Sequence, residues 1–120
     1  MTLTLPIPPT ANHLHTVSRG RKIKSQAARE YAHEVGWLIT DYLAYHRQAW
    51  KPTPNDRLRV DALIYPKDRR KFDIANREKA LLDSVFACLD ADDSQVDVLV
   101  LKRMPPDPAN PRVVLTLEAL

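Results

Sequence analysis

The longest periodic pattern in the chain lies between residues 25 and 43. Its apolar residues fall at the three- and four-residue spacing of one helix face. They are Ala28, Tyr31, Ala32, Val35, Leu38, Ile39, Tyr42 and Leu43. Ser25 stands at the front, where a hydroxyl group caps a helix well, and the segment WKPTPND (50–56) closes the pattern. The sequence therefore predicts a helix that begins at Ser25 and ends before residue 50.

Alternation of apolar and polar residues predicts the strands. Residues 57–65 place four apolar side chains on one face, and a proline follows. Segments 96–103 and 112–119 are rich in β-branched residues, and LTLPIPP predicts a short strand that runs into a turn. The connecting segment 104–111 (MPPDPANP) holds too many prolines for a sheet. We therefore expect the last two strands to form an antiparallel hairpin with a long loop.

A second helix is predicted from about Ile74 to Ala87, with Asp73 as its N-cap. Its apolar stripe, which should pack on the sheet, comprises Ile74, Leu81, Leu82 and Val85. Glu78 lies within this stripe, roughly 40° from its centre. Because an unpaired buried charge is costly, Glu78 either reaches a cation, such as a metal or an arginine, or lies at the rim and extends to solvent.

The elements follow one another in the order β-α-β-α-β-β. This order predicts an α+β fold, in which two main helices pack on a small mixed or antiparallel sheet. A chain of 120 residues has the usual length of one domain. We therefore expect a single domain over residues 1–120.

Composition narrows the class of protein. The chain is 44% hydrophobic and 28% charged, as in an ordinary soluble globule, and it lacks both a signal sequence and an apolar run of the about 18 residues that a membrane span needs. Cys88 is the only cysteine, which excludes an intrachain disulfide and fits a reducing compartment. We expect a cytoplasmic protein that does not bind a membrane.

Cationic residues are clustered, although the net charge is only +3. One run comprises Arg19, Arg21, Lys22 and Lys24, and a second comprises Lys67, Arg69, Arg70 and Lys71. Such clusters are typical of proteins that bind nucleic acid. Solvated surface loops produce similar runs, so the clusters alone leave both interpretations open.

Acidic residues gather at two places that flank the second helix. Asp73 precedes it, and Asp92 and Asp93 follow it in the turn DADD; these acids either cap helices and turns or bind a hard cation such as Mg²⁺. The helix carries the chain about 20 Å away from Asp73. Six extended residues return it by about 20 Å. Asp73 and Asp93 therefore meet within one chain only through an extended return, or else meet across a dimer.

Four segments of the chain follow one another in a recognisable order: LPIPPTANH, which contains Asn12, then SRGRK, DRRKFDIANREKALLDSV and LDADDSQVDVLVLK. Taken together, they resemble the RusA family of Holliday-junction resolvases. The resemblance implies a phage- or prophage-encoded hydrolase of DNA recombination and repair. It implies a homodimer that binds four-way junction DNA and cuts two strands symmetrically with Mg²⁺ or Mn²⁺.

The resemblance also implies roles for individual residues. Asp73, Lys79 and Asp93 match the catalytic positions, and Asp73 and Asp93 match metal ligands, with Asp92 and Glu78 as further candidates. The cation neutralises charge on the phosphoryl oxygens and activates water, while Lys79 stabilises charge in the transition state. The DNA-binding candidates are Arg19, Arg21, Lys22, Lys24, Arg69, Arg70, Lys71, Asn76 and Arg77.

Ala75 stands where the family's motif has its second acid, and alanine cannot bind a metal. Three explanations compete: Glu78 or Asp92 supplies the third carboxylate, the residue was changed deliberately to give an inactive form, or the protein has lost cutting and kept binding. The sequence thus predicts a metal-dependent junction endonuclease. Its rivals are a protein that binds branched DNA without cutting it and a globular domain whose acids only cap helices and turns.

Overall fold

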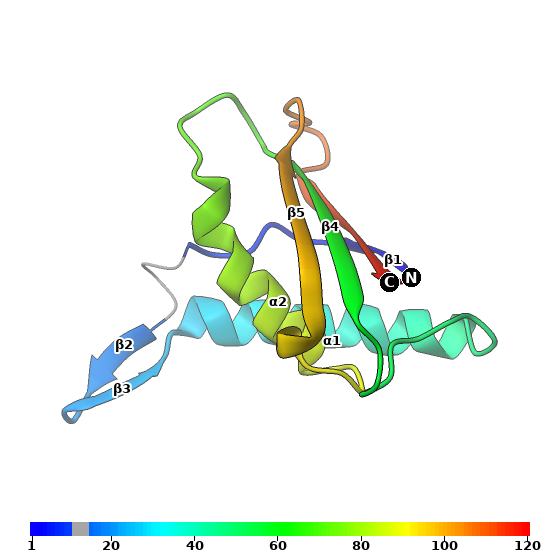
Figure 1. The fold of residues 1–120 in the computed structure, drawn as a ribbon. Helices are drawn as coiled ribbons and strands as arrows, with labels where there is room; N and C mark the ends of the chain where they lie inside the picture. The colour runs from blue at the N-terminus through cyan, green and yellow to red at the C-terminus, as the bar shows by residue number, and fades with distance from the viewer. Residues whose placement is uncertain (11–14) are drawn as a thin grey trace.

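A computed structural model describes residues 1–10 and 15–120 of the chain. The larger sheet has four strands in the order β1-β6-β4-β5 (Figure 1). The strands are β1 (Thr2–Leu5), β4 (Leu58–Tyr65), β5 (Val96–Arg103) and β6 (Arg112–Ala119). β5 runs parallel to β4, and both other pairs are antiparallel. The predicted α+β fold with a mixed sheet is confirmed.

The predicted hairpin between the last two strands is wrong. β6 pairs with β4 on one side and with β1 on the other, so β4 separates it from β5. Segment 104–111 crosses the end of β4 and is fastened there, because the backbone N–H groups of Met104 and Asp107 each donate at 2.8 Å, to Ile64 O and Pro66 O. Eight residues easily span the roughly 10 Å between next-nearest strands, so the long loop permits the crossing.

Two helices pack on one face of this sheet. α1 (Gln26–Tyr45) begins at Ser25, whose hydroxyl oxygen accepts a hydrogen bond from Ala28 N–H at 3.1 Å. The second predicted helix is divided into a 3₁₀ turn, η2 (Ile74–Arg77), and the α-helix α2 (Glu78–Phe86). Since β4 and β5 are parallel, η2 and α2 form the crossover that joins them.

The core lies between the helices and the inward face of the sheet. β4 contributes every second residue, and each of these side chains is completely buried. The fully buried core side chains include Val35, Ile39, Leu58, Val60, Ile64, Leu81, Val85, Val113, Leu115 and Leu117. The apolar stripe predicted for the second helix is confirmed at Leu81, Leu82 and Val85, while Ile74 is partly buried against the same core.

A second, two-stranded sheet was not predicted. β2 (His15–Ser18) and β3 (Arg21–Lys24) form an antiparallel hairpin, which Figure 1 shows projecting from the body. Arg19 and Gly20 make its turn with positive φ angles of 52° and 76°, a conformation that glycine adopts without strain. Asn12, quoted for the family resemblance, lies outside the described residues.

The helices of the described residues do not provide a membrane span, since none of them is both long and apolar enough.

Candidate functional site

The loop between β4 and η2, residues 66–73, carries the second cationic run. Asp68 shapes it, because its carboxylate accepts the Arg70 N–H at 3.0 Å and lies 3.5 Å from the Arg70 guanidinium. The Arg103 side chain donates to Arg70 O at 3.1 Å and so fixes the loop to the end of β5. Arg69 and Lys71 are exposed, which leaves their charges facing solvent.

Asp73 is the N-cap of η2, as predicted. Its Oδ1 accepts the Ala75 N–H at 3.0 Å, and the residue is exposed. Among the described residues its second oxygen has no hydrogen bond and no salt bridge. Asp73 therefore presents one carboxylate oxygen to solvent at the start of a helix.

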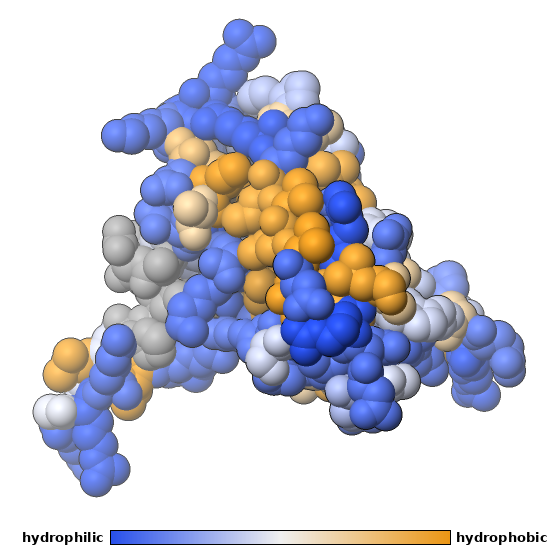
Figure 2. Space-filling view, in the orientation of Figure 1, coloured by the Kyte–Doolittle hydropathy of each residue, from blue (hydrophilic) through white to orange (hydrophobic). Residues whose placement is uncertain are grey.

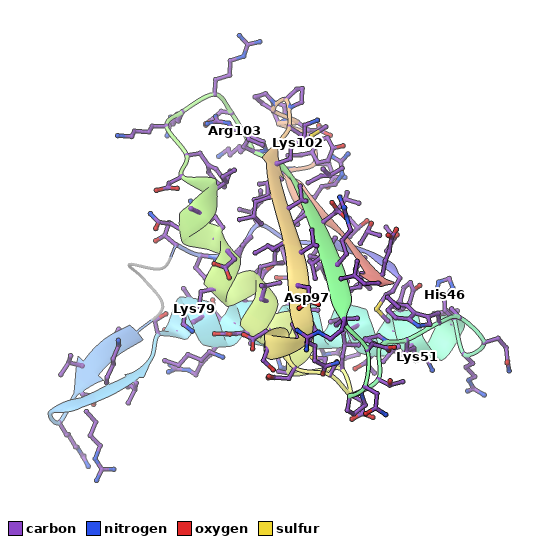
Figure 3. The ribbon with its side chains drawn as sticks, in the orientation of Figure 1. His46, Lys51, Lys79, Asp97, Lys102 and Arg103 are labelled. Atoms are coloured by element: carbon purple, nitrogen blue, oxygen red, sulfur yellow. The ribbon has the colours of Figure 1, made fainter. Side chains whose placement is uncertain are left out.

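Ala75 and Lys79 are both exposed beside this cap. The Lys79 ammonium lies 3.3 Å from Asp83 Oδ2, one helical turn further on. An exposed pair of this kind contributes little free energy, so Lys79 can leave Asp83 for an anionic ligand. In Figure 3 Lys79 lies on the same side of the molecule as the projecting hairpin.

Glu78, the first residue of α2, is half-exposed. No described residue forms a salt bridge with it, which agrees with the rim position that the sequence left open. The 3₁₀ geometry of η2 turns the chain by about 120° per residue, not 100°. The angular position calculated for Glu78 on a continuous α-helix therefore does not hold.

Arg77 takes part in a structural contact that the sequence did not predict. Its Nη1 donates to Pro8 O at 2.7 Å, and its guanidinium stacks 4.4 Å above the Phe72 ring. Burial lowers the pKa of Arg77, and its Nε is buried without a partner among the described residues. Arg77 thus fastens the N-terminal segment to η2, and its role in DNA binding stays a prediction. Asn76, beside it, is half-buried.

The acidic turn after α2 is held by a capping box. Asp92 caps the 3₁₀ turn η3 (Asp93–Gln95), and its Oδ2 accepts hydrogen bonds from the hydroxyl and backbone N–H of Ser94. The side-chain hydrogen bond from Ser94 is the main reason that the pKa of Asp92 is lowered. One carboxylate oxygen of Asp92, Oδ2, is therefore engaged within its own turn.

Gln95 is a structural residue that sequence reasoning missed. It is buried, its Oε1 accepts the Asp92 N–H at 2.8 Å, and its Nε2 donates to Thr53 O and Asp56 O, each at 2.8 Å. These hydrogen bonds join the acidic turn to the loop before β4. The sequence did contain a signal for this role, because Gln95 is a polar residue placed directly between the acidic turn and a strand rich in β-branched residues.

Asp73 and Asp93 lie at opposite ends of β5. Asp93 belongs to η3, which directly precedes β5, whereas Arg103 at its far end places its guanidinium 5.9 Å from the ring of Phe72, the neighbour of Asp73. The length of this strand puts roughly 20 Å between the two carboxylates. Figure 1 shows that α2 starts towards the end of β5 and not towards its beginning.

An extended segment after α2 would be needed to bring Asp93 back to Asp73 within one chain. In the described chain, residues 87–91 form turns and bends instead. Within residues 1–10 and 15–120, no three His, Cys, Asp or Glu side chains are close enough to hold a metal ion. Carboxylates are the ligand type that Mg²⁺ prefers, but one chain presents them at two separate places.

Comparison with known proteins gives a match to one family. The family model described as "Endodeoxyribonuclease RusA" matches residues 6–118, nearly the whole chain. No curated protein matches the sequence. The family match includes both acidic segments, the cationic loop and the projecting hairpin.

Replacing Gln95 by leucine should lower the free energy of unfolding by about 1–3 kcal/mol, because Thr53 O and Asp56 O lose their buried donor. Urea unfolding measures this change. Asn55→Ala, at an exposed position of the same loop, is the matched control and should unfold like the wild type. Equal stability of the leucine variant and the wild type would show that Gln95 does not fasten the turn.

Proposed function

The chain belongs to the RusA family of endodeoxyribonucleases, and we propose that it resolves Holliday junctions by paired, symmetric cuts that depend on a divalent metal. The family match over residues 6–118 is the observation that carries this proposal. According to this proposal, residues 1–120 act as one endonuclease domain, and the enzyme is a homodimer that works in the cytoplasm on four-way junction DNA.

Asp73 and Asp93 are the proposed metal ligands. Both are exposed, and their ligand chemistry fits Mg²⁺ or Mn²⁺. When bound, the cation would neutralise phosphoryl charge and activate water. Lys79 would release Asp83 and approach the scissile phosphate, where its ammonium stabilises the developing negative charge.

Their separation within one chain supports a site made from two chains. In a symmetric dimer, Asp73 of one protomer can lie beside Asp93 of the partner subunit, and the twofold axis then generates two equal sites. Two equal sites suit the cutting of two strands. A monomer, by contrast, would bring only one of these acids to each phosphate.

The exposed edge of the sheet offers an apolar surface for such a dimer. β5 is an edge strand, Leu99 is 38% exposed, and Val98 and Val100 are half-buried. Figure 2 shows apolar side chains gathered over β5 and beside α2. A free edge with an apolar surface favours association, so we propose that the second protomer covers it.

Ala75 supports a second candidate function, the binding of junctions without cleavage. It is exposed at the position of the family's second acid, and Oδ2 of Asp92 accepts two hydrogen bonds from Ser94. Glu78 is then the better candidate for a third carboxylate, because no described residue pairs with it. Without a contribution from Glu78, the site would bind metal too weakly to cut, and the protein would bind junctions without cleaving them.

The two-chain site is tested by mixing inactive variants. Asp73→Asn and Asp93→Asn should each abolish cleavage of a labelled four-way junction in Mg²⁺ or Mn²⁺. A mixture should recover nicking of one strand, because one of the two sites in a mixed dimer keeps both acids. If each site used acids of a single chain, the mixture would stay inactive. Absence of cleavage by the wild type in either metal would favour the binding protein.

The role of Ala75 is tested by a four-protein cycle with Glu78. Ala75→Asp should increase the single-turnover cleavage rate by at least about tenfold, since it adds a metal ligand where a helix start favours negative charge. Glu78→Gln should abolish cleavage but leave junction binding unchanged, and Ala75→Asp should partly restore the rate. Equal rates for all four proteins would assign metal binding to the aspartates at positions 73, 92 and 93 alone.

Phosphate contacts by the loop 66–73 are tested by salt dependence. Changing Arg69 and Lys71 to alanine should weaken junction binding and reduce the slope of log affinity against log salt by roughly two units. Arg47→Ala combined with Lys51→Ala removes the same charge from the exposed segment that follows α1, where Figure 3 labels Lys51. This control should keep the wild-type slope. An unchanged slope in the loop variant would mean that the loop faces away from DNA.

A further inference from the structure

The β2–β3 hairpin is built as an element that stands apart from the core. All side chains described between residues 16 and 24 are exposed, and none of them belongs to the hydrophobic core. In Figure 1 it projects beyond the start of α1, away from the four-stranded sheet. A two-stranded hairpin alone is only marginally stable in water. Its role must therefore lie outside the folding of the core.

Its composition fits a polyanion. Residues 15–24 contain four cations, Arg19, Arg21, Lys22 and Lys24, and no acid. Lys22 and Lys24 point to one face of the ribbon, whereas Arg21 points to the other, and Arg19 lies at the turn. Positive charge thus surrounds the hairpin and does not line only one side.

Apolar side chains accompany these charges. Val17 is 78% exposed and Ile23 is 40% exposed, and the strand register places them on opposite faces, with Val17 directly across from Lys22. A cation that only meets the phosphate backbone needs no exposed valine beside it. The base edges of the DNA major groove do present an apolar group, the thymine methyl, next to hydrogen-bonding groups.

We propose that this hairpin enters the major groove of one duplex arm of the DNA substrate, with Val17 or Ile23 against base edges and the cations against the flanking phosphates. The inference rests on the proposed function for its partner, DNA. The major groove is about 12 Å wide and admits a two-stranded β-ribbon. Two strands lie about 4.8 Å apart, and four-residue strands extend roughly 14 Å, so the ribbon has the size of the groove.

The base of the hairpin connects this contact to the candidate site. Arg29 donates to Lys24 O, and Ser25 caps α1 immediately after β3. On the other side, Tyr31 donates to Pro6 O at 2.9 Å and Arg77 fixes Pro8 to η2. A hairpin held by DNA would therefore orient α1 and η2, and with them Asp73, relative to the duplex arm.

A substitution at the turn changes the shape of the hairpin without changing its charge, so it tests the two contributions to binding separately. Gly20 has φ +76°, and no atom lies within 4 Å of the point that a Cβ would occupy there. Valine should therefore strain the turn without a clash at its Cβ, whereas asparagine tolerates positive φ. Gly20→Val should weaken binding to a short linear duplex about tenfold with all cations retained. Gly20→Asn should bind like the wild type, as should Gly36→Ala in α1. Both Gly20 variants should keep the wild-type melting temperature, whereas Gly36→Ala should raise it by a few degrees, because alanine favours a helix interior over glycine.

Methylation of guanine N7 tests whether the hairpin binds in the major groove, because this atom lies there. Methylated guanines in the contacted arm should interfere with binding by the wild type and Gly20→Asn, but not by Gly20→Val. Equal affinities, or an interference pattern that Gly20→Val does not change, would overturn the proposal and leave the hairpin as a flexible phosphate contact. This test uses linear duplex that is not cut, so its result does not depend on cleavage. The proposed function fails separately: a wild-type protein that binds duplex but neither binds nor cuts junctions would refute only that function.

Discussion

The hydrogen bonding of β4 on both of its edges determines where the candidate site residues lie. A parallel partner on one side requires a crossover through η2 and α2, and an antiparallel partner on the other requires segment 104–111 to pass over the strand. Both connections pass the same end of β4, where Asp107 N–H bonds Pro66 O and Arg103 bonds Arg70 O. The cationic loop and Asp73 are thereby brought to this end, and Asp93 is left at the other.

Local patterns were sufficient to predict the elements but not their pairing. The hydroxyl cap at Ser25 and the alternation from Leu58 to Ile64 depend on residues close in sequence, and the structure confirms both. The position of β6 depends on which strand pairs with the second edge of β4. The residues of β6 alone do not specify that partner, so no local pattern predicts it. The β2–β3 hairpin was missed for a different reason, because its exposed strands lack the buried face that produces alternation.

The candidate site shows the same limit. The exposed cap at Asp73 and the rim position of Glu78 agree with interpretations based on neighbouring residues. The hydrogen bond from Arg77 to Pro8 O and the contacts of Gln95 join segments that are distant in sequence, by 69 residues in the first case and by 42 and 39 in the second. These residues sit beside the charged positions and fix the backbone that presents them. Sequence reasoning therefore found the groups that face solvent and missed those that position them.

The separation of Asp73 from Asp93 has a consequence for when the protein can act. If each metal site needs an acid from two chains, a newly synthesised or dilute chain is harmless to the DNA around it, since an isolated protomer holds only half of each ligand set. Below the concentration at which two chains associate, few dimers would form, and the cutting rate would vary with the square of the chain concentration. The geometry of one strand would thus act as a threshold that protects unbranched chromosomal DNA until enough enzyme has accumulated.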